Sequence, residues 1–524
     1  MIGNRHQITL RQKIGLYGGI PVFLFLLFFP ISSILELFFH ISYPLEPIAQ
    51  KTLAIAILMA WLWITEALPI PATSLIPIVA FPLLKIMEGK QVVLSYGDSN
   101  IFLFMGGFFL AMALQKWELH RRIALHIIRL IGLGPNKIIL GFMIATAFLS
   151  MWISNTASTM MMYPIGLAII LQTTTLTGKN NQHLDAKTSS FQTALMLGIA
   201  YAASIGGIGT KIGTPPNIVF AAAVKSIFPE APEIGFLQWM LVGLPLVILL
   251  IPVTWIFLTK IALPIRIRSL PGSKQVIDKQ LAKLGPMKKA EIYVLIIFIL
   301  TALAWIFRKN IDLGAFFIPG WTNLLGIENF VNDATIAILS AILLFAIPVD
   351  LKEGKFLLDW DWAIKIPWGI LLLFGGGIAL AAGFKSTGLA AWIGKNLGLF
   401  SHVPLIVMIM ITCFMLTFLT EVTSNTATST IFMPILAATA MAMGIHPFLL
   451  MIPATISASC AFMLPVATPP NAIVFGSGCV SIPQMAKVGV GLNFIGILVV
   501  TTITYLVAIP AFGIVLGTLP VWIR

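Results

Sequence analysis

The sequence has few charged residues, and acids are the scarcer kind. Only 10% of its 524 residues are charged, with 19 acids against 32 Lys and Arg, whereas 58% are hydrophobic. The mean hydropathy is +0.99. A chain of this composition has far more apolar surface than one soluble core could bury. The shortage of charge therefore excludes a soluble globular protein and predicts an all-α polytopic membrane protein, surrounded by the lipid bilayer.

Cysteine is also scarce. Cys413, Cys460 and Cys479 lie in apolar sequence without paired or metal-ligand spacing, so we interpret them as small core residues. The net charge of +13 could indicate nucleic-acid binding, but the Lys and Arg residues lie in short loops and one linker. Membrane orientation explains this distribution better, so we expect no nucleic-acid partner.

Signatures of enzymes are missing from the sequence. It contains no nucleophile–base pair, metal-ligand spacing or nucleotide-binding loop, and Gly375-Gly376-Gly377 lies within an apolar run rather than after a strand. We therefore expect a protein that is not an enzyme and has no organic cofactor. The lack of a Walker-type sequence argues against direct use of ATP.

Two clusters of small polar residues interrupt the apolar runs. The sequence SNTAST at 154–159 recurs as SNTATS at 424–429, 270 positions later (425 minus 155). Each is followed by Thr-Pro-Pro-Asn, at 214–217 and 468–471. Polar groups at membrane depth must be satisfied by protein or by a ligand. One cluster could merely let helices approach closely, but two copies in register indicate a functional pair.

Apolar segments of spanning length predict about 11 transmembrane helices. Two stretches, 137–176 and 403–441, carry the clusters at their middle and predict two re-entrant hairpins. Two others, 191–227 and 447–478, predict spanning helices broken at their proline pairs, because proline removes a backbone donor. The remaining predicted spans lie near 14–40, 51–69, 70–88, 99–117, 236–259, 291–307, 334–349, 364–384 and 486–516.

These segments divide the chain into four parts. They are an N-terminal segment with the first span (1–50), repeat 1 (51–259), a linker (260–290) and repeat 2 (291–524). Five crossings separate the two clusters, so the halves are expected to have opposite orientation. Such an inverted repeat is common among secondary transporters, which bind substrate near the bilayer midplane between the repeats.

The linker suggests the orientation. Residues 260–289 hold eight Lys or Arg against one acid, Asp278, as is typical of a cytoplasmic segment. The spacing of Val276, Ile277, Leu281 and Leu284 predicts an amphipathic helix on the bilayer surface. We therefore expect a cytoplasmic N-terminus and an outside C-terminus. The short linker and the lack of long glycosylatable loops favour a bacterial inner membrane.

The polar clusters offer neutral groups only. Hard monovalent cations such as sodium bind several oxygens, and a carboxylate binds several N–H or O–H donors, so one small site could hold both. Since neither cluster contains Arg or Lys, cations bound beside an anionic substrate would supply the missing positive charge. This is a physical reason for coupled transport.

With Ser-Asn-Thr twice, Thr-Pro-Pro-Asn twice and Thr65-Glu66-Ala67-Leu68-Pro69, the sequence resembles the divalent anion:sodium symporter (DASS) family from about residue 50 onward. This family includes sodium-coupled dicarboxylate and citrate carriers. The resemblance implies a homodimer in which a transport domain moves against a scaffold domain by an elevator mechanism. It implies two sodium sites, one of Ser150, Ser154, Asn155 and Gly213 and one of Thr420, Thr423, Asn425 and Ala467. The implied substrate ligands are Asn155, Thr156, Thr214, Asn425, Thr426, Thr468 and Pro469.

The leading hypothesis is a secondary active symporter. It would import a small di- or tricarboxylate, such as succinate, malate, fumarate or citrate, with two or more sodium ions as co-transported cofactors. The alternatives are a sodium-independent carboxylate exchanger on the same scaffold, a channel and a membrane-embedded enzyme.

Three charged residues in apolar sequence have open roles. Glu66 is either an intramembrane acid or a helix-end residue, and Glu421 is either a proton site or the partner of a buried donor. Lys211 either reaches the substrate or extends to an interface, and we favour the interface.

Overall fold

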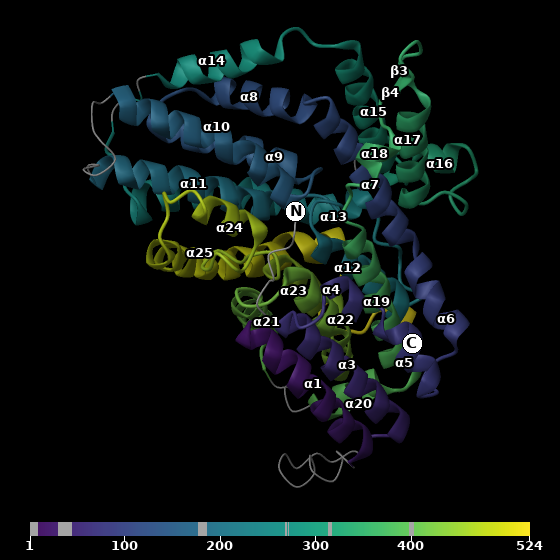
Figure 1. Ribbon diagram of the computed structural model, residues 1–524. Coiled ribbons are helices and arrows are strands. Elements are labelled where there is room, and N and C mark those ends of the chain that lie inside the picture. The colour runs from purple at the N-terminus through teal and green to yellow at the C-terminus, as the bar shows by residue number, and fades with distance from the viewer. Residues whose placement is uncertain are drawn as a thin grey trace, which may run out of the picture.

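The computed structural model describes residues 9–29, 44–176, 186–267, 270, 272–312, 317–397 and 403–523. Within these ranges the chain is predominantly helical, as predicted (Figure 1). Its two sheets are small antiparallel pairs. In them β1 (Ile311–Asp312) pairs with β2 (Phe317–Ile318), and β3 (Pro348–Asp350) pairs with β4 (Lys355–Phe356).

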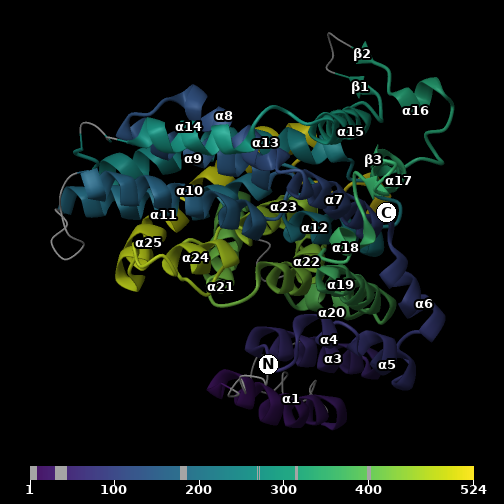
Figure 2. The same cartoon turned by 45° about the horizontal axis from the view of Figure 1, so that its top comes forward.

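The N-terminal helices form one side of the molecule. Figure 2 shows α1 (Leu10–Phe28) as its outermost layer, with α3 (Pro47–Thr65) above it and α19 (Trp368–Ser386) and α20 (Leu389–Leu397) beyond. Residues of α3, α19 and α20 share the smaller of two hydrophobic cores. This side therefore joins the start of the chain to its second half.

The predicted span at 70–88 is interrupted in the structure. It consists of α4 (Ile70–Thr73) and α5 (Ile76–Leu83). The physical reason is Pro77, which cannot donate to the carbonyl of Thr73 and whose ring would clash with it. A short helix and a 3₁₀ turn, α6 (Gly89–Leu94) and η1 (Ser95–Gly97), then lead into α7 (Ser99–Lys116).

Seven segments of the described chain contain helices long and apolar enough to cross a membrane: Leu10–Phe28, Pro47–Thr65, Gly89–Lys116, Phe236–Ala262, Lys289–Ile306, Trp368–Ser386 and Ile482–Ala511. Shorter apolar helices lie at Ile70–Leu83, Pro135–Ser150, Asp333–Ala346, Leu405–Thr420 and Phe448–Ser457. The count of eleven crossings stays a prediction.

Both polar clusters lie at the turn between two helices. The first turn joins α9 (Pro135–Ser150) to α10 (Asn155–Leu176), and the second joins α21 (Leu405–Thr420) to α22 (Asn425–Ala442). The two helices of each pair contact one another. A proline inside the second helix of each pair, Pro164 or Pro434, does not end it.

Both Thr-Pro-Pro-Asn motifs begin the second half of a broken helix. The halves are α11 (Ala186–Gly207) and α12 (Pro215–Ile227) in the first copy, and α23 (Phe448–Ser457) and α24 (Pro469–Phe475) in the second. The break falls before the prolines because proline is well suited to the first helical position, where no N–H is needed. The helices predicted to be broken, at 191–227 and 447–478, are therefore both interrupted in the structure.

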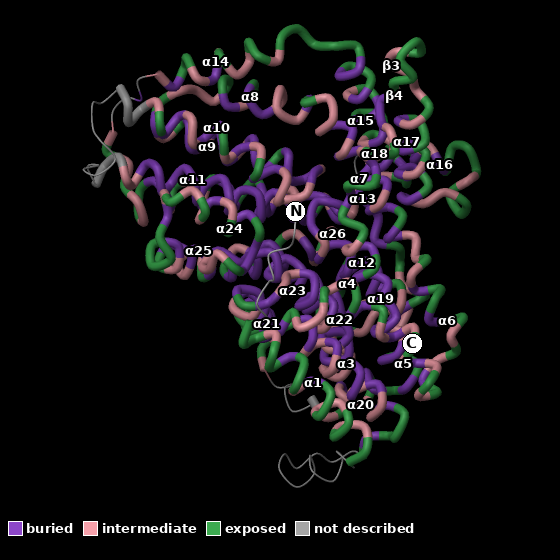
Figure 3. The backbone as a smooth tube through the Cα atoms, viewed as in Figure 1, coloured by how far each residue is buried: buried purple, intermediate pink, exposed green. Residues whose placement is uncertain are grey.

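The same order of elements continues after each broken helix. One long apolar helix follows, α13 (Phe236–Ile256) or α25 (Ile482–Ile503). Each runs into a π-helical segment, η3 (Phe257–Ala262) or η5 (Thr504–Ala508). Figure 3 shows that buried residues concentrate where α12, α22 and α23 meet, so the repeated elements form the centre of the molecule.

The linker contains the predicted amphipathic helix, α14 (Ser273–Leu284), whose Ile277 is fully buried. α14 contacts α8 (Leu119–Ile131) and α10, so its apolar side packs on protein. The second half begins with α15 (Lys289–Ile306) and α17 (Asp333–Ala346). The remaining short helices are α16 (Trp321–Leu324), α18 (Trp360–Ala363), α26 (Ile509–Ala511) and η6 (Val521–Ile523).

Candidate functional site

Both helix turns and both helix breaks line one cavity of about 600 Å³. Segments that are 270 residues apart in sequence thus share one space. Residues of α1, α4, α7 and α19 and the end of α3 complete its wall. Its polar lining from the repeated motifs consists of Ser154, Asn155, Thr156, Thr214, Thr423, Ser424, Asn425, Thr426 and Thr468.

The four helices that start in the repeated motifs begin at this cavity. Their first residues are Asn155, Pro215, Asn425 and Pro469, and all four residues line it. All four present the positive end of the helix dipole, but the first N–H groups come only from α10 and α22, because Pro215-Pro216 and Pro469-Pro470 have no backbone N–H. The cavity is therefore suited to an anion even though its repeated motifs carry no cationic side chain.

The two side chains predicted for the first sodium site, Ser150 and Asn155, lie in a compact group of oxygens together with a carbonyl outside the predicted set. Ser150 Oγ lies 2.6 Å from Asn155 Oδ1 and 2.7 Å from the carbonyl oxygen of Ala203 in α11. A hydroxyl has one proton, so it donates to one of these oxygens at a time. Ser154 and Gly213 line the cavity beside Asn155, whereas Ser150 is fully buried one layer behind it.

The two side chains predicted for the second sodium site, Thr420 and Asn425, have the same arrangement. Thr420 Oγ1 lies 2.6 Å from Asn425 Oδ1 and 3.0 Å from the carbonyl oxygen of Ala458. Thr423 and Ala467 line the cavity, and Thr420 is buried behind Asn425. Each copy thus brings together a hydroxyl, an amide oxygen and a carbonyl oxygen, which are ligand types of hard cations.

All seven predicted substrate ligands line the cavity. Asn155 and Thr156 come from the first turn, Asn425 and Thr426 from the second, and Thr214, Thr468 and Pro469 from the two breaks. Thr214 caps α12 without a side-chain capping bond. Thr468 differs, because its Oγ1 accepts a hydrogen bond from the N–H of Asn471 at 3.3 Å.

The last residue of each Thr-Pro-Pro-Asn motif stabilises the unwound segment between the two halves of its helix, which is 208–214 in the first copy and 458–468 in the second. Asn217 Nδ2 donates to the carbonyls of Gly207 at 3.2 Å and Thr210 at 2.7 Å. Asn471 Nδ2 donates to those of Ala461 at 3.2 Å and Leu464 at 3.0 Å. These amides satisfy carbonyls that the break leaves without helical partners, so each asparagine stabilises the open backbone beside the cavity.

Lys211 is buried in the protein interior. It neither extends to an interface nor lines the cavity. Its Nζ donates to the carbonyl of Ile234 at 2.6 Å and lies 3.3 Å from Asp333 Oδ2. Both charged side chains are 2% exposed. The predicted interface position is therefore wrong, because a buried aspartate supplies a partner. The pair ties the first unwound segment to the start of α17.

The network extends to the protein surface through Arg308. Arg308 Nε lies 2.8 Å from Asp333 Oδ1, and its Nη2 donates to both carboxylate oxygens of Glu233 at 2.9 Å. Lys309 pairs with Glu233 at 2.9 Å. Burial raises the pKa of Glu233, but the cations Arg308, Lys309 and Lys211 more than offset this and bring it down to about 2. The carboxylate is therefore charged at neutral pH.

Glu421 supports the second unwound segment. Its carboxylate accepts hydrogen bonds from the N–H groups of Phe462 at 2.7 Å, Met463 at 2.9 Å and Leu464 at 3.1 Å. Asn493 Nδ2 adds a fourth at 2.8 Å. Of the two predicted roles, the structure agrees with the partner of buried donors. Lys211 and Glu421 thus hold the two unwound segments with opposite charges.

Sequence reasoning missed Arg11, which reaches the cavity from α1. Glu66, the C-cap of α3, lies there too, and these are the only charged residues among the described residues that line the cavity. Glu66 is thus a helix-end residue. Only tertiary packing brings α1 to the cavity, and the local sequence around Arg11 carries no signal for it.

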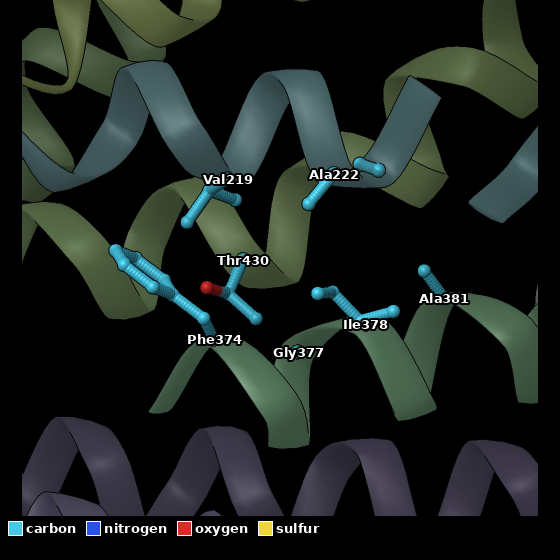
Figure 4. A pocket seen from close by; sticks show the side chains of 8 residues that line it. Val219, Ala222, Phe374, Gly377, Ile378, Ala381 and Thr430 are labelled. Carbon is cyan, nitrogen blue, oxygen red and sulfur yellow. The ribbon is translucent and has the colours of Figure 1, made fainter. Parts of the chain in front are cut away.

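A second cavity, between α12, α19 and α22, is not a binding site for a carboxylate. It measures about 10 Å³, and Figure 4 shows the Thr430 hydroxyl among apolar side chains that include Val219, Phe374 and Ile378. This volume holds at most one water molecule. These three helices are therefore closely packed behind the site.

Together, the apolar helices, the two broken helices and the shared polar cavity define an integral membrane protein with the architecture of a secondary transporter. The chain belongs to the family described as "Sodium:sulfate symporter transmembrane region", whose profile matches residues 23–518. This agrees with the resemblance found in the sequence. The family is one of transporters and not of enzymes.

Two similar curated proteins are named "sodium-dependent dicarboxylate transporter SdcS". The one from Staphylococcus saprophyticus is 47% identical over 464 residues, covering 88% of this chain and 86% of the relative. The one from Staphylococcus aureus strain bovine RF122 is 47% identical over 505 residues, covering 96% and 92%.

Solved structures share the fold at low sequence identity. The Alcanivorax borkumensis YdaH transporter superposes with a TM-score of 0.55 at 13% identity, covering 95% of this chain and 98% of that one. Neisseria gonorrhoeae MtrF gives 0.54 at 12%, covering 95% and 96%. These similarities show a transporter fold.

Proposed function

We propose that the protein is a secondary active symporter that imports small di- or tricarboxylates together with two or more sodium ions. The observation that carries this proposal is the doubled group of hydroxyl, amide and carbonyl oxygens beside one cavity. The names of the relatives, which describe sodium-dependent dicarboxylate transport, support it.

Each sodium ion binds between the hydroxyl and amide oxygens of one group, in place of the hydrogen bond that joins them. The first ion is bound by Ser150 and Asn155 with backbone of Ser154 and Gly213. The second is bound by Thr420 and Asn425 with backbone of Thr423 and Ala467. The 2.6 Å separation of hydroxyl and amide oxygens in both groups supports these sets, since a cation can accept lone pairs from both oxygens at once.

The carboxylate substrate binds between the two turns. Its oxygens are met by the hydroxyl and amide groups of Asn155, Thr156, Thr214, Asn425, Thr426 and Thr468 and by the N-terminus of α24 at Pro469. The sodium ions bind beside the substrate, and their positive charge stabilises the dianion. Substrate and sodium therefore raise each other's affinity, as thermodynamic linkage requires.

Transport follows alternating access by an elevator mechanism in a homodimer. The repeated order of a helical hairpin, a broken helix and a long helix with a π-helical end supports two halves of inverted orientation. The hairpins are re-entrant, the N-terminus is cytoplasmic and the C-terminus lies outside. The basic linker supports this orientation. Bacterial relatives support a location in a bacterial inner (plasma) membrane.

Uptake into proteoliposomes tests the proposal. We expect radiolabelled succinate to accumulate when sodium is higher outside than inside, and uptake to stop when choline replaces sodium. Vesicles without protein are the control. Equal uptake in sodium and choline, stimulated by internal dicarboxylate, would instead identify a sodium-independent exchanger on the same scaffold.

A further inference from the structure

The N-terminal helix is docked against one edge of the cavity. Thr9 caps α1, and Gln12 Nε2 donates to the carbonyl of Glu66 at 3.3 Å. A Cβ atom added to Gly15 would overlap Thr65 and Ala67, so this glycine allows the close approach of α1 to the end of α3. The position of the first turn of α1 beside the cavity is therefore set by several contacts.

Arg11 joins the two walls of the cavity. Its Nε donates to the carbonyl of Ile64 at 2.8 Å, and its Nη2 donates to the same carbonyl and to that of Val422 at 3.4 Å. Val422 immediately precedes the second polar cluster at Thr423 and Ser424. The guanidinium thus lies between the end of α3 and the turn that carries Asn425.

The charge of Arg11 is incompletely paired. The nearest carboxylate oxygen, of Glu66, lies 3.8 Å from its Nη2, and the side chains of Arg11 and Glu66 are 44% and 54% exposed. An ion pair of this kind contributes little. No described residue accepts a hydrogen bond from Arg11 Nη1. A planar guanidinium with free donors is the side chain best matched to a carboxylate.

We infer that Arg11 is a specificity-determining residue, which favours dianionic substrate in the cavity by exchanging its contact with Glu66 for one with a carboxylate of the substrate. This inference rests on the proposed function. The neutral donors of the two turns bind carboxylate groups of any substrate alike, whereas Arg11 favours the substrate with the larger charge. Glu66 opposes it, because it competes for the guanidinium and repels the anion.

Binding of radiolabelled succinate to the purified full-length protein, at fixed sodium, tests the inference. Arg11→Gln is expected to weaken binding about two- to fivefold, as for a partly exposed charge pair. Glu66→Gln is expected to tighten it about two- to fivefold. Arg11→Lys retains the charge without the planar fork and is expected to fall between wild type and Arg11→Gln. Adding choline chloride should reduce the difference in succinate affinity between wild type and Arg11→Gln, because salt screens exposed charges.

Lys13→Gln is the matched control. Lys13 lies on the same helix, is exposed and carries the same charge, but it does not line the cavity, so its loss should leave succinate binding within about twofold. Equal succinate binding by Arg11→Gln and Lys13→Gln would overturn the inference. Weaker binding by both Arg11→Gln and Glu66→Gln would also overturn it, because that is the result expected of an ion pair with a purely structural role. If wild type itself binds no succinate in sodium, the proposed function fails instead.

Discussion

Replacing Lys211 by methionine tests the buried link between the first unwound segment and α17. Methionine has similar length and no charge, so the substitution removes the ammonium group without opening a large cavity. It leaves the carbonyl of Ile234 without its donor at 2.6 Å. It also takes one of two cations from Asp333, since Arg308 remains 2.8 Å away.

The expected loss follows from this arrangement. Removing one partner of a fully buried ion pair costs about 3–5 kcal/mol, because the other charge is left uncompensated. Asp333 keeps Arg308, so we expect Lys211→Met to lose about 2–3 kcal/mol, at or below the low end of that range. Asp333→Ala should cost more, because it leaves two buried cations facing each other.

Thermal unfolding of the purified protein in detergent ranks these variants, with the circular-dichroism signal at 222 nm as the readout, since all helical structure contributes to it. Lys225→Met is the matched control. Lys225 lies 3.3 Å from Asp98, the same distance as in the Lys211–Asp333 pair, but its side chain is 57% exposed. Exposed pairs contribute about 0–1 kcal/mol, so this variant should unfold close to wild type.

Two outcomes would refute the reasoning. If Lys211→Met unfolds at the same temperature as Lys225→Met, the buried pair does not stabilise the unwound segment. If Asp333→Ala is milder than Lys211→Met, then the aspartate does not compensate two cations. In either case the ion network would not account for the open backbone at Gly213 and Thr214.

The other predictions concern the oxygen groups, a close helix approach and an acid-sensitive pair. Asn155→Ala and Asn425→Ala should each reduce sodium-dependent succinate uptake at least about tenfold, because each amide is proposed to bind sodium and substrate. The unfolding temperature should stay within a few degrees, because Ser150 and Thr420 can still donate to the carbonyls of Ala203 and Ala458. Gly206→Ala should prevent normal folding, since its Cβ would overlap the backbone of α9, whereas Gly97→Ala, with open space around it, should leave the yield of monodisperse protein unchanged. The pKa of Glu233 is lowered to about 2, so its ion pairs contribute stability that is present above an unfolded pKa of about 4.5 and lost as pH falls toward 2. Glu233→Gln should therefore show a smaller drop in unfolding temperature between about pH 5 and pH 3 than wild type.

The positions of the turns and breaks could be predicted because their causes are local. A polar cluster in an apolar run marks a turn, and consecutive prolines mark a helix start. The structure places α10 and α22 from Asn155 and Asn425 and α12 and α24 from the proline pairs. The grouping of both motifs at one cavity was anticipated from their repetition.

What could not be predicted depends on contacts between distant segments. Lys211 finds its carboxylate 122 positions away, and Arg11 meets Val422 across 411. Neither separation leaves a pattern in one sequence. The break between α4 and α5 was missed for another reason. Prolines are tolerated in membrane helices, and Pro164 and Pro434 lie within continuous helices, so Pro77 alone did not specify a break.

The opposite charges that hold the two unwound segments mean that the halves of the molecule are not interchangeable parts. A lysine in place of Glu421 would face the N–H groups of Phe462, Met463 and Leu464 and be repelled by their positive ends, whereas the Glu421 carboxylate accepts hydrogen bonds from all three. A glutamate set in place of Lys211 would face Asp333. The two halves thus share an order of elements but not the charge that stabilises the unwound segment, so a chimera that exchanged Lys211 and Glu421 would be destabilised in both halves.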